Sequence, residues 1–271
     1  MPHPLPATET LKLERAGARL VVMLNRPEQR NAMSGQMVRE LNAVFDAIQD
    51  DRSVRVVVLR GAGGTFCAGG DIKDMASSGA DQSAGNAMQQ RNRSFGALCQ
   101  KVNAAPQVVI AMVEGAAMGG GFGLVCVSDV AIAHQNAVFG MPEVTLGILP
   151  AQIAPFVVRR IGMTQARKIA LTGQRINGEA ARDLGLVHHV CASSEDMDAV
   201  LTTTLQQVMA AAPGAIAGTK ELLTMVPDVP LEKVLDRAAE LFAGAVRGPE
   251  GREGTTAFVQ KRKAAWVEPL E

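Results

Sequence analysis

The chain has 271 residues, of which 47% are hydrophobic and 20% are charged, so it can bury a large core. Lysine and arginine together number 27, as do aspartate and glutamate; the resulting formal net charge of zero argues against a nucleic-acid-binding protein. Aromatic residues make up 3% and tyrosine is absent, so few rings are available to stack on bases.

The four cysteines and four histidines form no metal-binding pattern. Cys67, Cys99, Cys126 and Cys191 are scattered without CxxC spacing, which favours buried free thiols over disulfides or zinc ligation. The sequence starts without a signal-peptide pattern and contains no apolar stretch of membrane-spanning length. We therefore expect a cytoplasmic protein that binds no metal, no membrane and no nucleic acid.

Short strands and helices alternate along most of the chain. Apolar and β-branched runs predict strands at 12–15, 18–24, 54–59, 108–113, 129–133 and 187–190. Ser34 is expected to cap a helix, because apolar residues recur at helical spacing behind it and its hydroxyl oxygen accepts free N–H groups. This alternation predicts an α/β fold with crossover connections.

The last part of the sequence is helical in pattern. From about Ser193 onward the helical pattern is broken only at proline and glycine positions. We therefore divide the chain into a core of residues 1–200 and a helical segment of residues 201–271, with the boundary near 190–205. Isolated short helices bury little surface, so this segment is expected to pack on the core or on another subunit.

Two glycine-rich loops, 61–71 and 115–123, each follow a predicted buried strand. Small residues allow a ligand to approach the backbone, and a helix start supplies free N–H groups. If the loops converge from adjacent strands, they can direct two N–H donors at one oxygen, as in an oxyanion hole. For either loop alone, a tight strand-to-helix corner is the alternative. A dinucleotide-binding loop is disfavoured because the GxGxxG spacing is missing.

The two loops and four further segments carry a family resemblance. The motifs are Asn25-Arg26-Pro27 with Asn31-Ala32-Met33, Phe66-Cys67-Ala68-Gly69-Gly70-Asp71-Ile72, Gly115-Ala116-Ala117-Met118-Gly119-Gly120-Gly121, Phe139-Gly140-Met141-Pro142-Glu143-Val144, Thr172-Gly173 with Leu184-Gly185-Leu186-Val187, and Ala257-Phe258-Val259-Gln260-Lys261-Arg262-Lys263. In this order and spacing they resemble the enoyl-CoA hydratase/isomerase (crotonase) family over about residues 10–265. The resemblance implies a crotonase (ClpP-like) spiral of ββα units with a C-terminal helical trimerisation segment. It also implies a homotrimer or a dimer of trimers.

The resemblance further implies a chemistry. Such enzymes bind an acyl-CoA thioester, use no cofactor beyond its coenzyme A moiety, and hold the thioester oxygen between two backbone N–H groups. By motif position these donors are Ala68 and Gly120, and each such donor is worth about 3–4 kcal/mol to a transition state with enolate character. The coenzyme is expected to run along Ala68, Gly69, Gly70, Asp71 and Ile72.

One acid/base glutamate of the family is present and its partner is missing. The family's hydratases carry one glutamate at the position of Glu143 and another at the position of Gly123, which has no side chain to offer. Apolar neighbours such as Met141 and Val144 would raise the pKa of a buried Glu143, which suits a group that takes and gives a proton near neutral pH. A surface carboxylate at the turn after Pro142 is the alternative.

The glycine at position 123 and the segment 149–158 are similar to the branched-chain glutaconyl-CoA hydratases of the family, and segment 140–143 resembles the isohexenylglutaconyl-CoA type more than the methylglutaconyl-CoA type. The residues expected around the acyl chain are Met75, Met88, Met112, Met118, Gly123, Met141 and Gln152. Core filling is the alternative for each methionine. Arg91 and Arg93 are candidates for binding the second carboxylate of a glutaconyl group, with a solvated helix face as the alternative.

Basic residues are expected to bind the phosphates of coenzyme A. The candidates are Arg26, Arg30, Lys261 and Lys263, and a surface charge without a role is the alternative for each. The family's hydratases often have a lysine where this chain has Glu28, so Arg30 is expected to replace that contact.

The leading hypothesis is a hydro-lyase that adds water to a branched 2-enoyl-CoA of isohexenylglutaconyl or 3-methylglutaconyl type, in acyclic terpene or leucine breakdown. An enoyl-CoA isomerase is the first alternative, because moving a proton between C2 and C4 needs only Glu143. A non-catalytic CoA- or RNA-binding protein of the same fold is an alternative of another class, against which the zero net charge and the retained Glu143 both count. Decarboxylation of a malonyl-type thioester is a further alternative.

Overall fold

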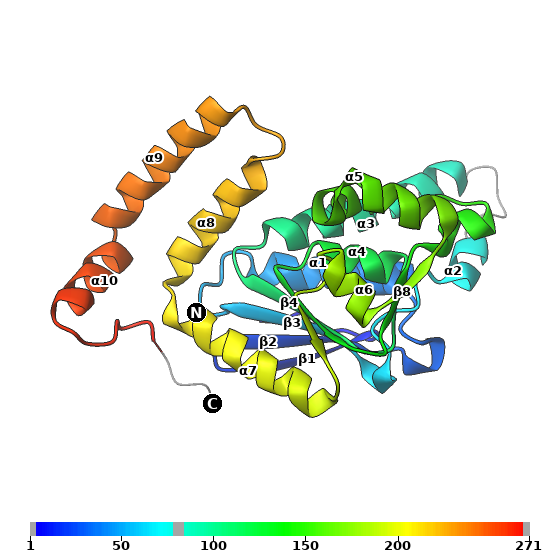
Figure 1. Ribbon diagram of the computed structural model, residues 1–271, viewed down its shortest axis with the longest axis horizontal. Coiled ribbons are helices and arrows are strands. Elements are labelled where there is room, and N and C mark those ends of the chain that lie inside the picture. The colour runs from blue at the N-terminus through cyan, green and yellow to red at the C-terminus, as the bar shows by residue number, and fades with distance from the viewer. Residues whose placement is uncertain (1–3, 78–83, 268–271) are drawn as a thin grey trace.

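The computed structural model of this chain describes residues 4–77 and 84–267, with side chains for 4–74 and 87–267. Its centre is a six-stranded sheet in the order β1-β2-β3-β4-β6-β9 (Figure 1). The strands are β1 (Leu11–Ala16), β2 (Arg19–Leu24), β3 (Val56–Gly61), β4 (Val108–Val113), β6 (Val130–His134) and β9 (His189–Cys191). β1 and β2 are antiparallel, and every later pair in this sheet is parallel. The predicted α/β class with crossover connections is therefore confirmed.

Helices cover both faces of this sheet. One face is covered by α1 (Gly35–Ile48), α3 (Ala84–Ala104), α4 (Gly120–Cys126) and α5 (Ala154–Thr172), and the other by α7 (Ser194–Ala210) (Figure 1). Alternate residues of β3 enter different cores: Val57 and Leu59 pack toward α1, whereas Val56 and Val58 pack toward α7. Burial on both faces explains why β3 and β4 are continuous apolar runs in the sequence.

A second sheet has three strands, two of which lead into segments that line the pocket described below. It consists of β5 (Ala116–Met118), β7 (Val138–Gly140) and β8 (Arg175–Asn177). β5 runs directly into α4, and β7 leads into the short helix η3 (Pro142–Leu146). Three-residue strands are too short to show an alternating pattern, so the sequence did not predict them.

Most of the predicted local features are confirmed. Each predicted strand starts and ends within two residues of an observed one. Ser34 caps α1 as expected, because its Oγ accepts the Met37 N–H at 3.2 Å. All four cysteines are buried free thiols. The remaining elements are η1 (Pro27–Gln29), η2 (Ala62–Gly64), α2 (Ile72–Ser77) and α6 (Gly178–Asp183).

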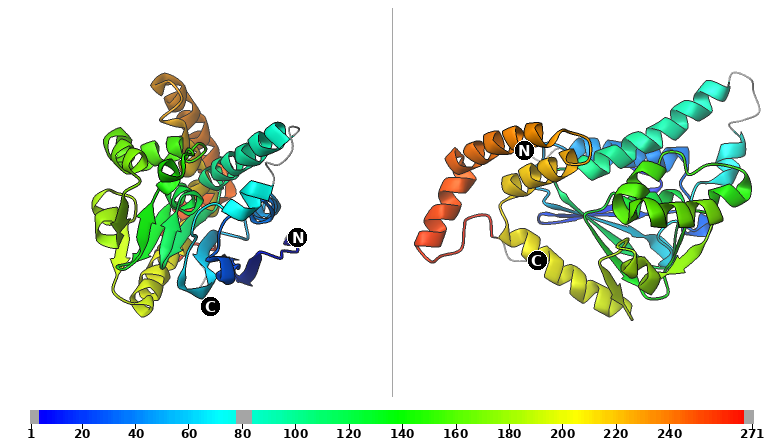
Figure 2. Two further views of the ribbon diagram at one scale, coloured as in Figure 1. Left: turned by 90° about the vertical axis from the view of Figure 1, so that its right-hand side faces the viewer. Right: turned by 45° about the horizontal axis from the view of Figure 1, so that its top comes forward.

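The last three helices extend away from the sheet as an arm (Figure 2). They are α8 (Pro213–Met225), α9 (Leu231–Arg247) and α10 (Pro249–Val259). The boundary predicted at residue 200 is misplaced, because it falls inside α7, whose Leu201 and Leu205 are buried beneath the sheet. The core therefore extends to the end of α7, and the arm begins at α8.

No helix within the described residues is long and apolar enough to cross a membrane. The His, Cys, Asp and Glu residues of the described ranges form no group of three or more that could hold a metal ion.

An ion pair fastens the arm to the sheet. Lys220 of α8 places its Nζ 2.5 Å from Asp129 Oδ2 and donates to the Gln107 carbonyl at 3.0 Å. The same carboxylate oxygen accepts the Val109 N–H at 2.7 Å. The Lys220 side chain is only 11% exposed. This contact joins α8 to the starts of β4 and β6.

Replacing Lys220 with methionine is expected to destabilise the protein by about 3 kcal/mol, the lower end of the range for breaking a buried pair, because Asp129 is left without its cation. The free energy of unfolding, measured by urea titration with circular dichroism, tests this. Arg237→Met removes two exposed ion pairs of α9, with Glu221 and Glu240, and serves as the control with little expected change. Equal effects of the two substitutions would contradict the prediction.

Candidate active site

A pocket of about 200 Å³ opens where the two glycine-rich loops meet α3. Residues 68–70 and 118–120 form one side of its lining, and α3 contributes one helical face. The segment 146–153, which follows η3, completes the wall. The sequence prediction that the two loops converge on one place is confirmed.

The peptide bond between Gly69 and Gly70 directs one N–H donor into this pocket. The Gly69 carbonyl accepts the Met33 N–H at 2.7 Å. In a trans peptide the C=O and N–H point in opposite directions, so the Gly70 N–H points away from Met33 and toward the pocket that Gly70 lines. Within the described part of the chain this N–H makes no hydrogen bond. Gly69 adopts φ 105°, which a residue with a side chain rarely takes.

Gly120 supplies a second donor by the same rule. The Gly119 carbonyl accepts the Gly123 N–H at 3.0 Å inside α4, so the Gly120 N–H points out of the helix start. The loops are close together, since a Cβ on Gly119 would lie 3.6 Å from Gly69 Cα. Gly70 and Gly120 therefore present two backbone donors to one pocket.

The predicted donor Ala68 is wrong, whereas Gly120 fits. The Ala68 N–H donates to the Arg30 carbonyl at 3.0 Å and is not free for a ligand, although Ala68 does line the pocket. The donor is found two residues later, at Gly70. Sequence reasoning missed it because the direction of each peptide depends on the φ angle of Gly69; the pair Gly69-Gly70 was the available signal.

Glu143, in η3, places its carboxylate over the second loop. A Cβ on Gly119 would lie 2.8 Å from Glu143 Oε1. The other oxygen, Oε2, is buried and has no hydrogen-bond partner among the described residues. Burial raises the pKa of Glu143 above its ordinary value of 4.5. A carboxylate in this state is suited to take and give a proton beside the two donors.

Gly123 lies behind the pocket wall. A Cβ at this position would lie 2.3 Å from Ile153 Cγ2 and 3.8 Å from the Phe95 ring. Ile153 is 3% exposed and itself lines the pocket. The predicted substrate contact of Gly123 is therefore wrong, because Ile153 stands in the way. Glu143 is the one acidic side chain that lines the pocket within the described ranges.

One face of α3 forms the opposite wall. It presents Met88, Arg91, Asn92 and Phe95, which recur at helical spacing. The Phe95 ring lies over Gly120, where a Cβ would come 3.2 Å from the ring. Met88 and Arg91 line the pocket, and their predicted contacts with the substrate stay predictions. Asn92 and Phe95 were missed, although their spacing of four and seven residues from Met88 was a usable signal.

Arg93, the second candidate for a substrate carboxylate, lies on another face of α3. Its guanidinium donates to Gln100 Oε1 at 3.0 Å, on the exposed surface, and it does not line the pocket. This prediction is wrong because helical geometry turns position 93 away from the face shared by 88, 91, 92 and 95.

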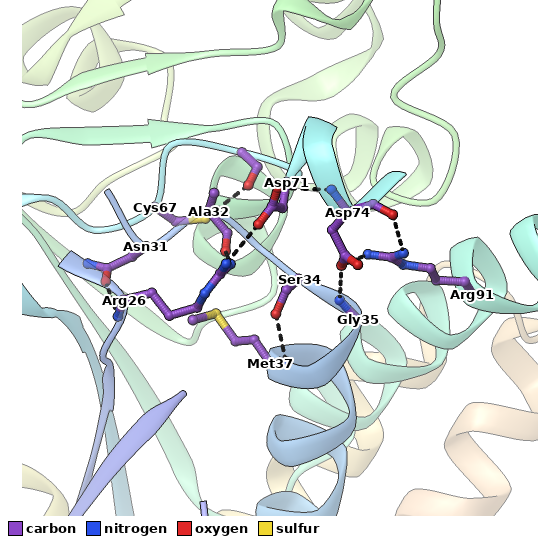
Figure 3. A network of polar contacts seen from close by, with 11 residues as sticks. Arg26, Asn31, Ala32, Ser34, Gly35, Met37, Cys67, Asp71, Asp74 and Arg91 are labelled. Carbon is purple, nitrogen blue, oxygen red and sulfur yellow. Dashed lines mark hydrogen bonds and ion pairs between the residues drawn. The ribbon is translucent and has the colours of Figure 1, made fainter. Parts of the chain in front are cut away.

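A network of ion pairs and hydrogen bonds joins the first loop to α1 and α3 (Figure 3). Arg26 lies 2.8 Å from Asp71, whose Oδ1 accepts the Asp74 N–H at 3.2 Å. The Asp74 carboxylate accepts the Gly35 N–H at 2.8 Å and pairs with Arg91. The loop, the start of α1 and the pocket face of α3 are thus held in one arrangement.

This network corrects two predicted coenzyme contacts. Neither Arg26 nor Asp71 lines the pocket, and the Arg26 guanidinium is engaged by Asp71 and by the Ala32 carbonyl. Burial acts to raise the pKa of Asp71, but the hydrogen bond and charge of Arg26 outweigh it and lower the pKa. The two residues therefore form a structural ion pair.

The other predicted residues divide into pocket and non-pocket positions. Those that line the pocket are Ala68, Gly69, Gly70, Ile72, Met88, Met118, Gly120, Glu143 and Gln152. Met112 is wrong as a pocket residue, because it packs in the core on the α7 side of the sheet. Met141 is also wrong, being 1% exposed within the main core. The side chain of Met75 lies outside the described residues.

The other basic residues predicted to bind phosphate, Arg30, Lys261 and Lys263, are exposed and do not line the pocket. Arg30 is on the loop after η1, where its carbonyl holds Ala68. Lys261 and Lys263 follow α10, which lies at the opposite end of the molecule from α2 and the first loop (Figure 1). These lysines therefore lie away from the pocket of the same chain.

The fold and the paired donors define an enzyme of the acyl-thioester class. Residues 14–269 match the family Enoyl-CoA hydratase/isomerase, and the chain belongs to that family. Pseudomonas aeruginosa AtuE, a solved structure, is 57% identical with a TM-score of 0.93 over 96% of this chain and 100% of its own. Enoyl-CoA hydratase ACTT6 of Alternaria alternata is 35% identical over 96% of this chain and 84% of its own length. The peroxisomal Delta(3,5)-Delta(2,4)-dienoyl-CoA isomerase of Arabidopsis thaliana is 30% identical over 89% and 90%.

The predicted crotonase fold is thereby confirmed. The activity is of the enoyl-CoA hydratase/isomerase type, and the substrate is an acyl-CoA thioester. Both hydratases and an isomerase occur among the relatives, so family membership alone leaves the choice between these two reactions open.

Replacing Glu143 with glutamine is expected to stabilise the folded protein near neutral pH. Burial raises the folded-state pKa of Glu143, so this group favours the folded state fully below the unfolded pKa and that contribution is lost as the pH rises through the folded pKa. Glutamine keeps the shape without the buried charge. Melting temperatures at pH 8 and at pH 4.5 test this: the variant should melt higher at pH 8, and the difference should shrink at pH 4.5. A variant that melts lower at pH 8 would refute it.

Gly123→Ala is expected to destabilise the protein by about 1–2 kcal/mol. The steric overlap of the new methyl group with Ile153 costs more free energy than the higher helix propensity of alanine contributes. Removing the obstacle should make the change tolerable. The double variant with Ile153→Ala should be more stable than the sum of the two single changes predicts, by about 1 kcal/mol. Urea unfolding of all four proteins measures this coupling, and strict additivity would show that the two positions do not compete for space.

Proposed function

We propose that this protein is a hydratase that adds water to a branched 2-enoyl-CoA, with Glu143 as its single acid/base group. The observation that carries the proposal is the Glu143 carboxylate, whose buried Oε2 has no hydrogen-bond partner among the described residues, in the same pocket as the Gly70 and Gly120 N–H groups. Backbone donors of this kind stabilise the negative charge that develops on a thioester oxygen during the reaction.

In the proposed reaction Glu143 serves first as base and then as acid. It takes a proton from water while the oxygen of that water bonds to C3 of the enoyl group, and the C2=C3 electron pair moves to form the enolate. Gly70 and Gly120 hold the enolate oxygen. The protonated Glu143 then returns the proton to C2, so that one water molecule is added and the enzyme is restored.

Isomerisation is the second candidate, and the filled space beside Gly123 favours it. With Ile153 where a second carboxylate would need room, the pocket holds one acidic side chain among its described residues. In this reaction Glu143 removes a proton from C2 of a 3-enoyl-CoA and returns it to C4. The same two N–H donors stabilise the intermediate enolate.

The acyl group that we propose is of glutaconyl type, either isohexenylglutaconyl or 3-methylglutaconyl. The similarity of Gly123 and of the segment 149–158 to that subgroup supports it. The pocket mouth adds support, since Ile72, Leu146 and Leu149 line it while 60%, 56% and 75% exposed. A bulky apolar chain would cover these side chains. No cofactor other than the coenzyme A part of the substrate is proposed.

We further propose that the active assembly is a homotrimer or a dimer of trimers. α9 leaves Leu231, Leu235 and Phe242 between 60% and 73% exposed, and its one buried residue is Val234. An amphipathic helix with such a face is suited to packing on another subunit. Lys261 and Lys263 would then meet the coenzyme phosphates of a neighbouring subunit.

The decisive assay compares the protein with its Glu143→Gln variant. The thioesters offered are crotonyl-CoA, 3-methylglutaconyl-CoA, isohexenylglutaconyl-CoA and a 3-enoyl-CoA, with products identified by mass spectrometry. A hydratase gives a product about 18 mass units heavier from a glutaconyl thioester, and the variant is expected to be slower by at least ~100-fold, the usual contribution of a general acid/base. Glu195→Gln, at an exposed position on α7, is the control.

The outcomes separate the two candidates. A mass-neutral shift of the double bond, lost in Glu143→Gln, would replace the hydratase proposal with the isomerase. A variant as active as the protein itself would remove Glu143 from either reaction.

A further inference from the structure

A hydrogen-bonded pair of amide side chains lies in the wall of the pocket. Gln152 Nε2 donates to Asn92 Oδ1 at 2.9 Å, and both residues line the pocket. Gln152 belongs to the segment after η3 and Asn92 to α3, so the bond closes one wall of the pocket on another. Met88 and Phe95, which lie on the same face of α3 as Asn92 and also line the pocket, are apolar.

A glycine in the middle of α3, Gly96, leaves the space in which the Gln152 amide lies. A Cβ on Gly96 would lie 1.9 Å from Gln152 Oε1 and 2.9 Å from its Cδ, so any larger residue would displace the glutamine. Glycine is a poor residue for the interior of a helix. Its presence one turn after Asn92 is explained by the space that the glutamine amide needs.

The hydrogen bond from Gln152 orients the amide group of Asn92. Because Asn92 Oδ1 already accepts from Gln152, the group that remains on Asn92 is its Nδ2, which carries two N–H donors and no acceptor. Within the described residues this Nδ2 makes no hydrogen bond. A donor held in this way is prepared for an acceptor that a ligand brings.

The neighbouring residue is also a donor. Arg91 lines the pocket, and its guanidinium is held by Asp74, which also accepts the Gly35 N–H (Figure 3). Among the pocket-lining side chains of the described residues, Arg91 is the one base and Glu143 the one acid. Besides the two N–H donors and the Glu143 carboxylate, the pocket lining therefore includes two polar side chains of α3, Arg91 and Asn92.

We propose that Asn92 is a specificity-determining residue, whose Nδ2 donates to a carboxylate on the far part of the acyl group. Gln152 is a positioning residue that acts through Asn92, and Gly96 leaves the space that the Gln152 side chain occupies. A carboxylate fits because its oxygens accept hydrogen bonds from amide N–H donors, and a hydrogen bond to an ionised acceptor is stronger than one to a neutral acceptor. This inference rests on the proposed function in one respect, that the pocket binds the acyl part of a coenzyme A thioester.

The test uses a matched pair of unreactive thioesters. 3-Methylglutaryl-CoA carries the distal carboxylate, and 3,5-dimethylhexanoyl-CoA has two methyl groups in place of its two oxygens. The ratio of their dissociation constants, measured by isothermal titration calorimetry, reports the value of the carboxylate contact alone. Asn92→Asp keeps the acceptor for Gln152 and exchanges the donor for an oxygen. It is expected to shift this ratio against the carboxylate by roughly 30-fold.

A second variant tests the positioning role while leaving both amides in place. Gly96→Ala displaces Gln152 and is favourable for the helix, so the protein should fold. It should shift the ratio in the same direction by a smaller factor. Gly218→Ala on α8, where a Cβ meets no atom within 4 Å, is the matched control and should leave the ratio unchanged.

Two further measurements distinguish this inference from the proposed reaction. With 3-methylglutaconyl-CoA as substrate, Asn92→Asp should raise KM more than it lowers kcat, because the carboxylate carries the same charge in the bound substrate and in the transition state. An unchanged ratio of dissociation constants in Asn92→Asp would overturn the inference even if the enzyme is a hydratase. Absence of turnover in the unmodified protein would overturn the proposed reaction, while the binding ratio would still decide the role of Asn92.

Discussion

The hydrogen bond from the Met33 N–H to the Gly69 carbonyl is the constraint on which the candidate site depends. It fixes the peptide plane that carries the Gly70 N–H, and a small rotation of that plane would turn the donor out of the pocket. Donors stabilise a developing charge only when they are aimed in advance. The ion pair of Arg26 with Asp71 holds the same loop from the other side. Two residues expected to bind the coenzyme thus hold the donor in place.

The acid at the site follows the opposite principle. Asp71 is paired with the Arg26 cation and has a lowered pKa, whereas Glu143 has a buried Oε2 without a hydrogen-bond partner among the described residues and has a raised pKa. An unpartnered carboxylate costs stability, and nothing in the packing around η3 requires it. Reactive groups are commonly retained at such a cost. The opposite directions of the two pKa shifts distinguish Asp71, which has a structural role, from Glu143, which is suited to proton transfer.

The features that were predictable from sequence are those with a hydrophobic pattern along the chain or with an interaction partner a few residues away. The runs at 54–59 and 108–113 are apolar because β3 and β4 are covered on both faces, and Ser34 caps a helix that starts beside it. The wrong predictions share another cause. Whether Ala68 or Gly70 offers its N–H depends on one φ angle, and whether Arg26 meets a phosphate depends on Asp71, forty-five residues away. Met112 failed for a related reason, since alternation along β4 sends it to the far face of the sheet.

The glycines of the two loops were interpreted from sequence as places where a ligand approaches the backbone. Two of them, Gly119 and Gly123, have another purpose, as does Gly96 of α3, because a side chain from another segment occupies the space of the missing Cβ. Glu143 lies over Gly119, Ile153 over Gly123, and Gln152 over Gly96, at 2.8, 2.3 and 1.9 Å from the place of the absent atom. All three side chains belong to the stretch from η3 to the start of α5. The glycines on α3, just before α4 and within α4 therefore allow one segment to place Glu143, Ile153 and Gln152 at the pocket. The chemistry of the pocket is then decided jointly by that segment and by the positions that make room for it.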